Sequence, residues 1–453
     1  MTVKKSRSFV IVIFVIISIL VSLIVVFSSM LYLRHRNYVD VNGELYPIGT
    51  ETFTVNDVSS IKDYSVFNRF PSMRSIDFTG AEMTLSDYDY VAGQLDDRIQ
   101  ILWNVPVGSG YCASTVESLS FDEKTDIVDF TFLKYLPNLK EVSVSGISVS
   151  PRLKSILDPV RALPQVMLRC STSVYDVPFD TDTELLDLNA LKLTDLSDLD
   201  LAISLFPNLK SVEICSCRLS NETIAALNDK YPDTRVVWLL RIKKYSIRTD
   251  AQVFSTLIDG KKLITDKLAE PIFKYCTELR ALDMGHNTLH DLKPIVNLKK
   301  LHTLILADNC LSDLSPLKEL TNLRYVEIQW NWITNVEPLS ELPLLTDLKL
   351  DRNGKIKNIT LLLKCKNLEK LFISECGISD ADIRTLKANL PNNCHLSYKK
   401  ETSDIGFWRM NNKKNANIRK AFFNWQKVKE FPDWQTIIYW ERDAYDFSGG
   451  QSS

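Results

Sequence analysis

The sequence is poor in the residues and motifs around which most catalytic sites are built. Only five of its 453 residues are histidine. It contains no Gly-x-Ser-x-Gly, His-Glu-x-x-His or phosphate-binding-loop pattern, and no dinucleotide-binding fingerprint. We therefore expect no enzymatic activity, no catalytic residues and no cofactor.

The few histidines do not point to a metal site. His286 and His290 are four residues apart, and His302 follows later in the chain. The segment is expected to form turns rather than a helix, so this spacing does not bring two rings onto one face. We interpret them as exposed structural histidines, with a metal site as the alternative, and we predict no metal.

Charge of one predominant sign is also absent. The chain has 54 basic and 56 acidic side chains, for a formal net charge of −2. No global positive field would attract a nucleic acid, and no zinc-finger or RNA-binding motif is present. We therefore expect no nucleic-acid partner.

The nine cysteines follow no spacing that indicates a disulfide framework or a zinc site. Cys215 and Cys217 are alternate residues of an expected strand, so their side chains point to the same face. We expect most of the thiols to be buried and free, where they act as small apolar side chains. Free thiols are unusual in an oxidising exterior.

What the sequence does have is a repeated leucine phrase. The leucines that open it recur at intervals of 22, 22, 22 and 23 residues: Leu279, Leu301, Leu323, Leu345 and Leu368. Each opens the pattern Leu-x-x-Leu-x-Leu-x-x-Asn-x-Leu, with apolar replacements in some copies. Five copies in register identify a leucine-rich repeat array.

The chemistry of the phrase predicts the fold. Its Leu-x-Leu part is a short strand whose alternate side chains face inward. The asparagine amide can satisfy backbone groups in the following turn, so stacked copies should form a structural ladder. The ladder positions are Asn287, Asn309, Asn331, Asn353 and Cys376. One coil cannot bury its apolar edge alone, so we expect an α/β leucine-rich-repeat solenoid, a curved horseshoe with a parallel concave sheet.

The second half of the repeat narrows the class. A proline stands at the same position in three copies, at Pro294, Pro316 and Pro338. Proline there prevents a full helix and leaves 3₁₀ or extended turns on the convex side. The pattern resembles the short 22-residue repeats of internalins, which are bacterial surface proteins, and of a phosphatase regulatory subunit. The resemblance implies a protein that works outside the cell.

The N-terminus carries the longest apolar run. Residues 1–8 include three basic side chains, and residues 9–33 have no formal charge. A helix of that length could cross a bilayer core. We predict a cytoplasmic N-terminus at 1–8 and a retained transmembrane helix at 9–33, with a cleaved signal peptide as the alternative. The positive-inside rule and the internalin resemblance predict a single-pass cell-membrane protein with residues 34–453 extracytoplasmic.

The rest of the chain is divided by the regularity of its repeats. We expect a stalk and N-terminal cap at 34–69, irregular leucine-rich repeats at 70–245, an insert or bend, in part helical, at 246–278, regular repeats at 279–394, and an aromatic and basic C-terminal cap and tail at 395–453. Seven basic residues and no acidic residue lie between 405 and 429. We interpret them as the solvated face of a capping helix, and contact with an anionic surface is the alternative.

The concave face is the expected binding surface. The third, fifth, seventh and eighth residues of each phrase point away from the core. In the third and fourth copies these positions combine aromatic and charged side chains, as binding hot spots do. The predicted partner-binding residues are Tyr325, Glu327, Gln329, Trp330, Asp347, Lys349, Asp351 and Arg352.

The function predicted from these features is non-catalytic binding of a macromolecular partner, a protein in the first instance, on the concave face. A second hypothesis is a glycan or wall polymer, because Trp330 and Tyr325 could stack on sugar rings. A third is a cytoplasm-facing scaffold or phosphatase regulator. Membrane contact is expected only through residues 9–33.

Overall fold

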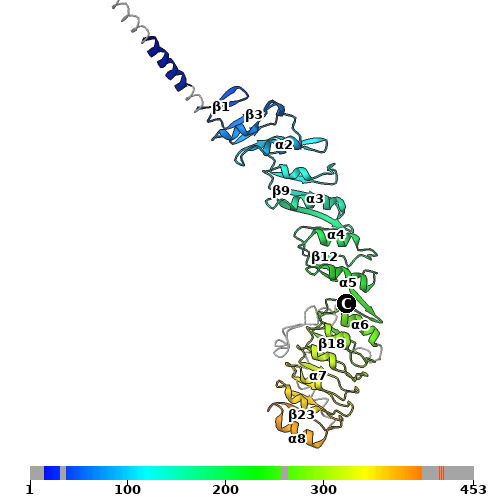
Figure 1. Cartoon of the computed structure of the whole chain (residues 1–453). Coiled ribbons are helices and arrows are strands. Elements are labelled where there is room, and N and C mark those ends of the chain that lie inside the picture. The colour runs from blue at the N-terminus through cyan, green and yellow to red at the C-terminus, as the bar shows by residue number, and fades with distance from the viewer. Residues whose placement is uncertain are drawn as a thin grey trace, which may run out of the picture. The chain divides into compact units, whose positions relative to one another are not determined.

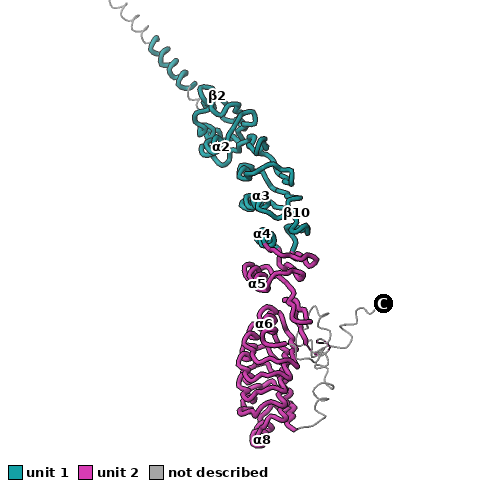
Figure 2. Tube along the Cα trace, turned by 90° about the vertical axis from the view of Figure 1, so that its right-hand side faces the viewer, with its two compact units in different colours: residues 1–183, 197–208 teal, residues 184–196, 209–453 magenta. Residues whose placement is uncertain are grey.

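The computed structural model describes residues 15–30, 37–256 and 264–399, together with 418, 420 and 422. The chain divides into two compact units, unit 1 with Met1–Thr183 and Ser197–Asn208, and unit 2 with Glu184–Leu196 and Leu209–Ser453 (Figure 2). The predicted N-terminus at 1–8 lies outside the described residues. So does the predicted C-terminal cap and tail from residue 400 onward, apart from the three positions named.

The apolar N-terminal run forms a helix that is described over residues 15–30. At 1.5 Å per residue the described part of this helix spans about 24 Å, whereas a bilayer core is about 30 Å thick. In the described part of the chain, no helix has both the length and the apolar character needed to cross a membrane. The predictions of a transmembrane helix at 9–33 and of a single-pass location in the cell membrane are therefore wrong.

Residues 37–256 follow a period that is longer than a single coil. Antiparallel hairpins begin at residues 38, 104, 171 and 239, at intervals of 66, 67 and 68 residues. The hairpins pair β1 (Tyr38–Val41) with β2 (Glu44–Pro47), β6 (Asn104–Val107) with β7 (Gly110–Ala113), the second half of β10 (Met167–Val174) with β11 (Val177–Asp180), and β15 (Leu239–Ile242) with β16 (Tyr245–Arg248). The sequence did not predict this super-repeat.

Three parallel strands, one from each coil, follow each of the first three hairpins. They are β3 (Thr52–Thr54), β4 (Ser75–Asp77) and β5 (Gln100–Leu102), then β8 (Ser118–Phe121), β9 (Glu141–Ser145) and the first half of β10, and then β12 (Leu185–Asp187), β13 (Ser211–Glu213) and β14 (Arg235–Val237). The connecting helices are α2 (Leu85–Ala92), α3 (Pro151–Arg161), α4 (Ser197–Leu205), α5 (Asn221–Lys230), and the 3₁₀ helices η1 (Val58–Ser60), η2 (Tyr64–Arg69) and η3 (Thr131–Tyr135). Irregular spacing predicted longer convex elements here, and the four α-helices have eight to eleven residues.

The fourth hairpin stands where we expected a helical insert from residue 246. Tyr245 and Ile247 are buried while Ser246 is exposed, an alternation of period two that favours a strand over a helix. After it, β17 (Val253–Ser255) joins the regular sheet and α6 (Asp266–Tyr275) lies in the same coil. The described part of 246–278 is thus half a hairpin and one further coil.

The regular repeats form a seven-stranded parallel sheet in chain order (Figure 1). After β17 its strands are β18 (Ala281–Asp283), β19 (Thr303–Ile305), β20 (Tyr325–Glu327), β21 (Asp347–Lys349), β22 (Lys370–Phe372) and β23 (His395–Ser397). Equivalent phrase positions pair from strand to strand, as Leu304 does with Val326. The convex elements after α6 are η4 (Lys293–Asn297), η5 (Ser315–Glu319), α7 (Glu337–Ser340), η6 (Ile359–Lys364) and α8 (Asp380–Asn389). Pro294, Pro316 and Pro338 each occupy the first turn of a short helix, where a missing N–H costs no hydrogen bond.

Behind each strand, a ladder of polar side chains joins the coils. Asn309 illustrates it: its Oδ1 accepts from the N–H of Leu289 (3.0 Å), and its Nδ2 donates to the carbonyls of Met284 (3.0 Å) and Leu306 (3.1 Å). Asn287, Asn331 and Asn353 make equivalent bonds. Cys376 in the fifth copy donates its thiol to the carbonyl of Leu350 (3.2 Å). Each buried amide therefore satisfies backbone groups of two neighbouring coils.

Candidate functional site

The outward side chains of β18 to β22, which we call the outer face, are not open to solvent. All three residues of each of these strands are buried, whereas β4, β9 and β13 bury only their inward residues. Six predicted partner-binding residues are buried here: Tyr325, Glu327, Gln329, Asp347, Lys349 and Asp351. The expectation of exposure holds only for Trp330 and Arg352. Strand alternation fixes which side chains face outward, but not whether that face is covered, and the role of all eight in binding stays a prediction.

The buried charges of the outer face lie beside opposite charges. Lys349 Nζ is 2.9 Å from Asp351 Oδ2 and 4.6 Å from the centre of the Phe372 ring. Lys370 Nζ is 3.8 Å from Asp347 Oδ1. Removing an ion from water without a partner costs several kcal/mol, so these neighbours are what make burial of the charges tolerable.

A second polar cluster lies on β20 and the residues directly after it. The Glu327 carboxylate accepts a hydrogen bond from the Tyr325 hydroxyl and another, of 3.3 Å, from Gln329 Nε2. All three side chains are buried. Together with the charged pairs, the cluster gives the outer face fixed donors and acceptors, which suit selective recognition of a polar or charged ligand.

A row of more exposed side chains follows the C-terminal ends of the strands. It consists of the eighth residue of each phrase, and we call it the edge row: His286, Asp308, Trp330, Arg352 and Glu375. Three of the four neighbouring pairs in the row are in contact. His286 Nδ1 is 3.0 Å from Asp308 Oδ2, the Arg352 guanidinium is 4.2 Å from the centre of the Trp330 ring, and Arg352 Nε is 2.9 Å from Glu375 Oε1. Trp330 is 52% exposed.

The edge row has a strained backbone. All five residues have φ between 53° and 58°, a left-handed conformation that costs a non-glycine residue about 1–2 kcal/mol. The N–H of Trp330 donates to the carbonyl of Asp351 (3.0 Å), and that of Arg352 to Ser374 (2.9 Å), which holds the conformation in place. Glycine would fit this position without strain, so backbone geometry does not explain why tryptophan and arginine are there.

Sequence reasoning identified the outward direction of Trp330 and Arg352, but it did not predict the strained turn or the contacts along the row. The sequence signal for the row was the position of these residues in the phrase. The eighth residue of every phrase directly precedes the ladder position, and no copy has glycine there.

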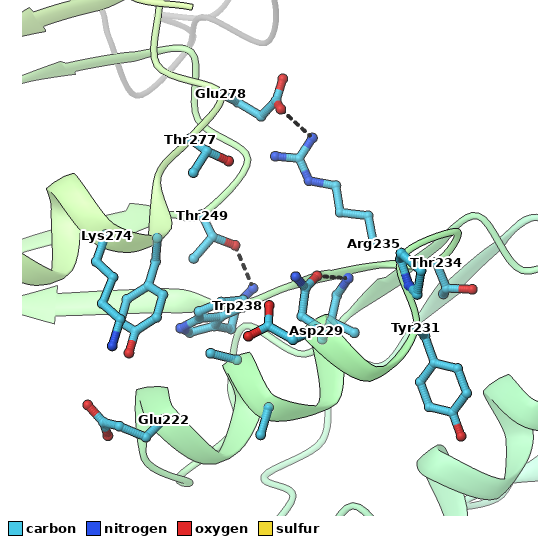
Figure 3. A pocket seen from close by; sticks show the side chains of 16 residues that line it. Glu222, Asp229, Tyr231, Thr234, Arg235, Trp238, Thr249, Lys274, Thr277 and Glu278 are labelled. Carbon is cyan, nitrogen blue, oxygen red and sulfur yellow. Dashed lines mark hydrogen bonds and ion pairs between the residues drawn. The ribbon is translucent and has the colours of Figure 1, made fainter. Parts of the chain in front are cut away.

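Sequence reasoning also did not predict a hollow of about 590 Å³ in unit 2 (Figure 3). It is lined by α5, β14 and the C-terminal part of α6 with the residues after it. Trp238 and Tyr275 pack edge to face at 5.4 Å, and Trp238 Nε1 donates to Asn221 Oδ1 (3.1 Å). Arg235 lies 3.8 Å from Glu278. The lining residues come from separate coils and share no repeat position, so no sequence pattern identifies them, and their mixed charges assign no ligand.

The structure places the three histidines beside different partners, and the expectation that they are exposed is wrong for His302, which is buried. His286 faces Asp308, His290 Nδ1 is 3.5 Å from Asp266 Oδ2, and the buried His302 has its Nδ1 3.0 Å from Thr303 Oγ1. Across residues 15–30, 37–256 and 264–399, no group of three or more His, Cys, Asp or Glu side chains is placed to hold a metal ion.

All nine cysteines are free thiols. Those fully buried are Cys170, Cys217, Cys276, Cys365 and Cys376. Burial raises the pKa of Cys170 to about 11 and also raises the pKa of Cys276. The thiols of Cys170 and Cys276 are therefore neutral near pH 7 and poor nucleophiles.

Comparison with known proteins agrees with this architecture. The model of the family described as Leucine Rich repeats (2 copies) matches residues 277–319. No curated protein matches the chain. Among solved structures, internalin C2 of Listeria monocytogenes is 22% identical, with 51% of this chain and 88% of that chain covered and a TM-score of 0.29. Another internalin of the same organism is 16% identical, with coverage of 78% and 85% and a TM-score of 0.25.

A leucine-rich-repeat protein of Leptospira interrogans is 13% identical, with coverage of 78% and 90% and a TM-score of 0.27. At these TM-scores the likeness supports no inference about function. The family match lies within the regular repeats, where the phrase recurs and the ladder joins the coils. Residues 277–319 thus match the leucine-rich-repeat family, and the chain as a whole resembles internalins.

Proposed function

We propose that the chain is a non-catalytic binding protein whose partner is another protein, and that the contact is centred on Trp330 and Arg352. Leucine-rich repeat proteins generally mediate protein interactions, because stacked coils present an extended, pre-formed surface. A rigid surface loses little conformational entropy on association. Binding then needs only a few well-placed anchor side chains.

One observation carries the proposal. Trp330 is exposed and held in a strained conformation, with the Arg352 guanidinium against its ring. Tryptophan and arginine are the residues most enriched among interface hot spots. The Arg352 guanidinium covers one side of the ring, and an aromatic ring beside a charged donor is the combination typical of protein interface hot spots.

The chain contains a matched control for this tryptophan. Trp332 is two residues further on and 66% exposed, but it is not part of the edge row. A photo-crosslinking amino acid is placed at position 330 or 332 of the full chain in its native cells. We expect the partner to be crosslinked from position 330 and not from position 332. Purified partner is then titrated against wild type, Trp330→Ala and Trp332→Ala, with circular dichroism confirming that each variant is folded.

We expect Trp330→Ala to weaken binding by about 2 kcal/mol, roughly 30-fold in Kd, and Trp332→Ala to change it by less than about threefold. Equal losses in the two variants, or no loss in either, would place the contact elsewhere. Specific crosslinking of polysaccharide at position 330 would support the glycan alternative instead.

A further inference from the structure

We propose that the outer face of β18 to β22 is a docking surface occupied by the chain's own C-terminal segment, residues 405–429, through Ile418 and Phe422. This proposal rests on the proposed function in one respect, because both place binding on the regular repeats. It concerns the outer face, whereas the proposed partner contact is on the edge row.

The first argument is the burial of the outer face. A single sheet with helices on one side leaves its other side in water, as the half-exposed Ser211 and Glu213 of β13 show. On the outer face, however, Tyr325 is 2% exposed and Asp347 0%. The convex helices of the repeats lie behind the sheet and cannot cover these side chains. A second layer on the outward side is therefore needed.

The second argument comes from the C-terminal segment itself. Ile418, Lys420 and Phe422 are helical, and Ile418 and Phe422 are each 1% exposed while Lys420 is exposed. Residues four apart lie on the same face of a helix. Two apolar side chains this deeply buried require an apolar surface to pack on. The outer face supplies one in its outward residues Ile305, Tyr325 and Phe372.

Charge complementarity supports the same pairing. The third, fifth and seventh positions of the five regular copies hold four acidic and two basic residues. The C-terminal segment holds seven basic residues and no acidic one. Opposite net charges favour the encounter and fix its orientation. A neutral or acidic segment with the same two apolar residues would lack this attraction.

The chain is long enough for the segment to return to the sheet. After β23, twenty residues separate Ser397 from Ile418, and at about 3.3 Å per residue they can reach roughly 60 Å. The distance back along the sheet from β23 to β20 is three strand spacings, about 14 Å. An external ligand for this face should copy the segment, as a basic helix with two apolar residues four positions apart.

The test uses the full chain with both apolar contacts replaced, Ile418→Asp with Phe422→Asp. The control is Val128→Asp, which adds an aspartate at a position that is 90% exposed. Amine acetylation followed by mass spectrometry measures the reaction rates of the buried Lys349 and Lys370. Lys140, which is exposed in unit 1, is the internal reference.

We expect Lys349 and Lys370 to react at least about tenfold faster in the double variant, because labelling requires the covering layer to open. Val128→Asp should react as wild type does. A synthetic 405–429 peptide should restore protection to the double variant, and a scrambled peptide of equal charge should not. Unchanged rates in a folded double variant would overturn the proposal. So would wild-type protection that is lost on dilution, which would identify a second copy as the cover.

The two proposals fail separately. Trp330→Ala should leave the outer face and the acetylation rates of Lys349 and Lys370 unchanged, whether or not the variant still binds its partner. The lysine rates report the covering layer without any partner present.

Discussion

Replacing Asn331 with alanine tests the register of the whole repeat array. Its Oδ1 accepts from the N–H of Leu311 (2.9 Å), and its Nδ2 donates to the carbonyls of Leu306 (3.0 Å) and Ile328 (3.1 Å). The side chain is buried. Alanine removes these three bonds and a longer fourth one, from Nδ2 to the carbonyl of Gln329 (3.3 Å).

The structure sets the size of the effect. One buried N–H left without an acceptor costs about 1–3 kcal/mol, and the carbonyls lose their amide donor as well. We therefore expect Asn331→Ala to lower the free energy of unfolding by about 2–4 kcal/mol. Asn322→Ala is the matched control. That exposed side chain makes one bond, to the carbonyl of Lys299 (2.8 Å), so its loss should cost less than about 1 kcal/mol.

Urea unfolding monitored by circular dichroism measures both variants, and hydrogen exchange at the Leu311 amide reports the broken bond directly. Asn331→Cys should lie between alanine and wild type, since the Cys376 thiol donates to the Leu350 carbonyl at the equivalent position. If Asn331→Ala and Asn322→Ala shift the unfolding midpoint equally, the ladder does not hold the coils together as argued.

Two further predictions concern charge and strain. Arg248 donates to Glu213 over 2.9 and 2.7 Å, and these hydrogen bonds lower the pKa of Glu213, so Arg248→Ala should cost about 1 kcal/mol of unfolding free energy in this partly exposed pair. A lowered carboxyl pKa stabilises the fold above the unfolded-state pKa and loses that effect as the pH falls through the folded-state pKa. Acidification from about pH 5 to 3 should thus destabilise wild type more than Arg248→Ala in urea titrations at each pH. Trp330→Gly should be about 1 kcal/mol more stable than Trp330→Ala, because glycine adopts a positive φ without strain, while titration should show both losing affinity for the partner.

The sequence was most informative where the repeat is regular. Leu304, Val326 and Leu348, the fourth residues of their phrases, each stand at the centre of a three-residue strand. A leucine phrase predicts this well because its period is set by local geometry and recurs in every coil.

The 67-residue super-repeat could not be predicted in the same way. Its hairpins share a position in the architecture but not a turn sequence. Asn42 and Gly43 are a recognised hairpin signal with positive φ at both residues. Tyr175 and Asp176 also have positive φ, in the turn of a later hairpin, yet neither residue type predicts such a turn. The feature that all four hairpins share is a positive φ at the first turn residue, at Asn42, Gly108, Tyr175 and Lys243, and four different residue types at these positions give no common sequence signal.

The binding surface shows a second physical limit on what can be predicted from the sequence. Outward side chains can be assigned from alternation, but alternation does not say what covers them. In our proposal the covering residues, Ile418 and Phe422, lie far away in the sequence. A docked segment tethered to the array competes at an effective concentration in the millimolar range. A partner for the outer face must overcome that competitor, whereas a partner for the edge row meets Trp330 directly. The exposed row is thus the surface suited to the first contact, and the covered face suits a ligand that resembles the segment it displaces.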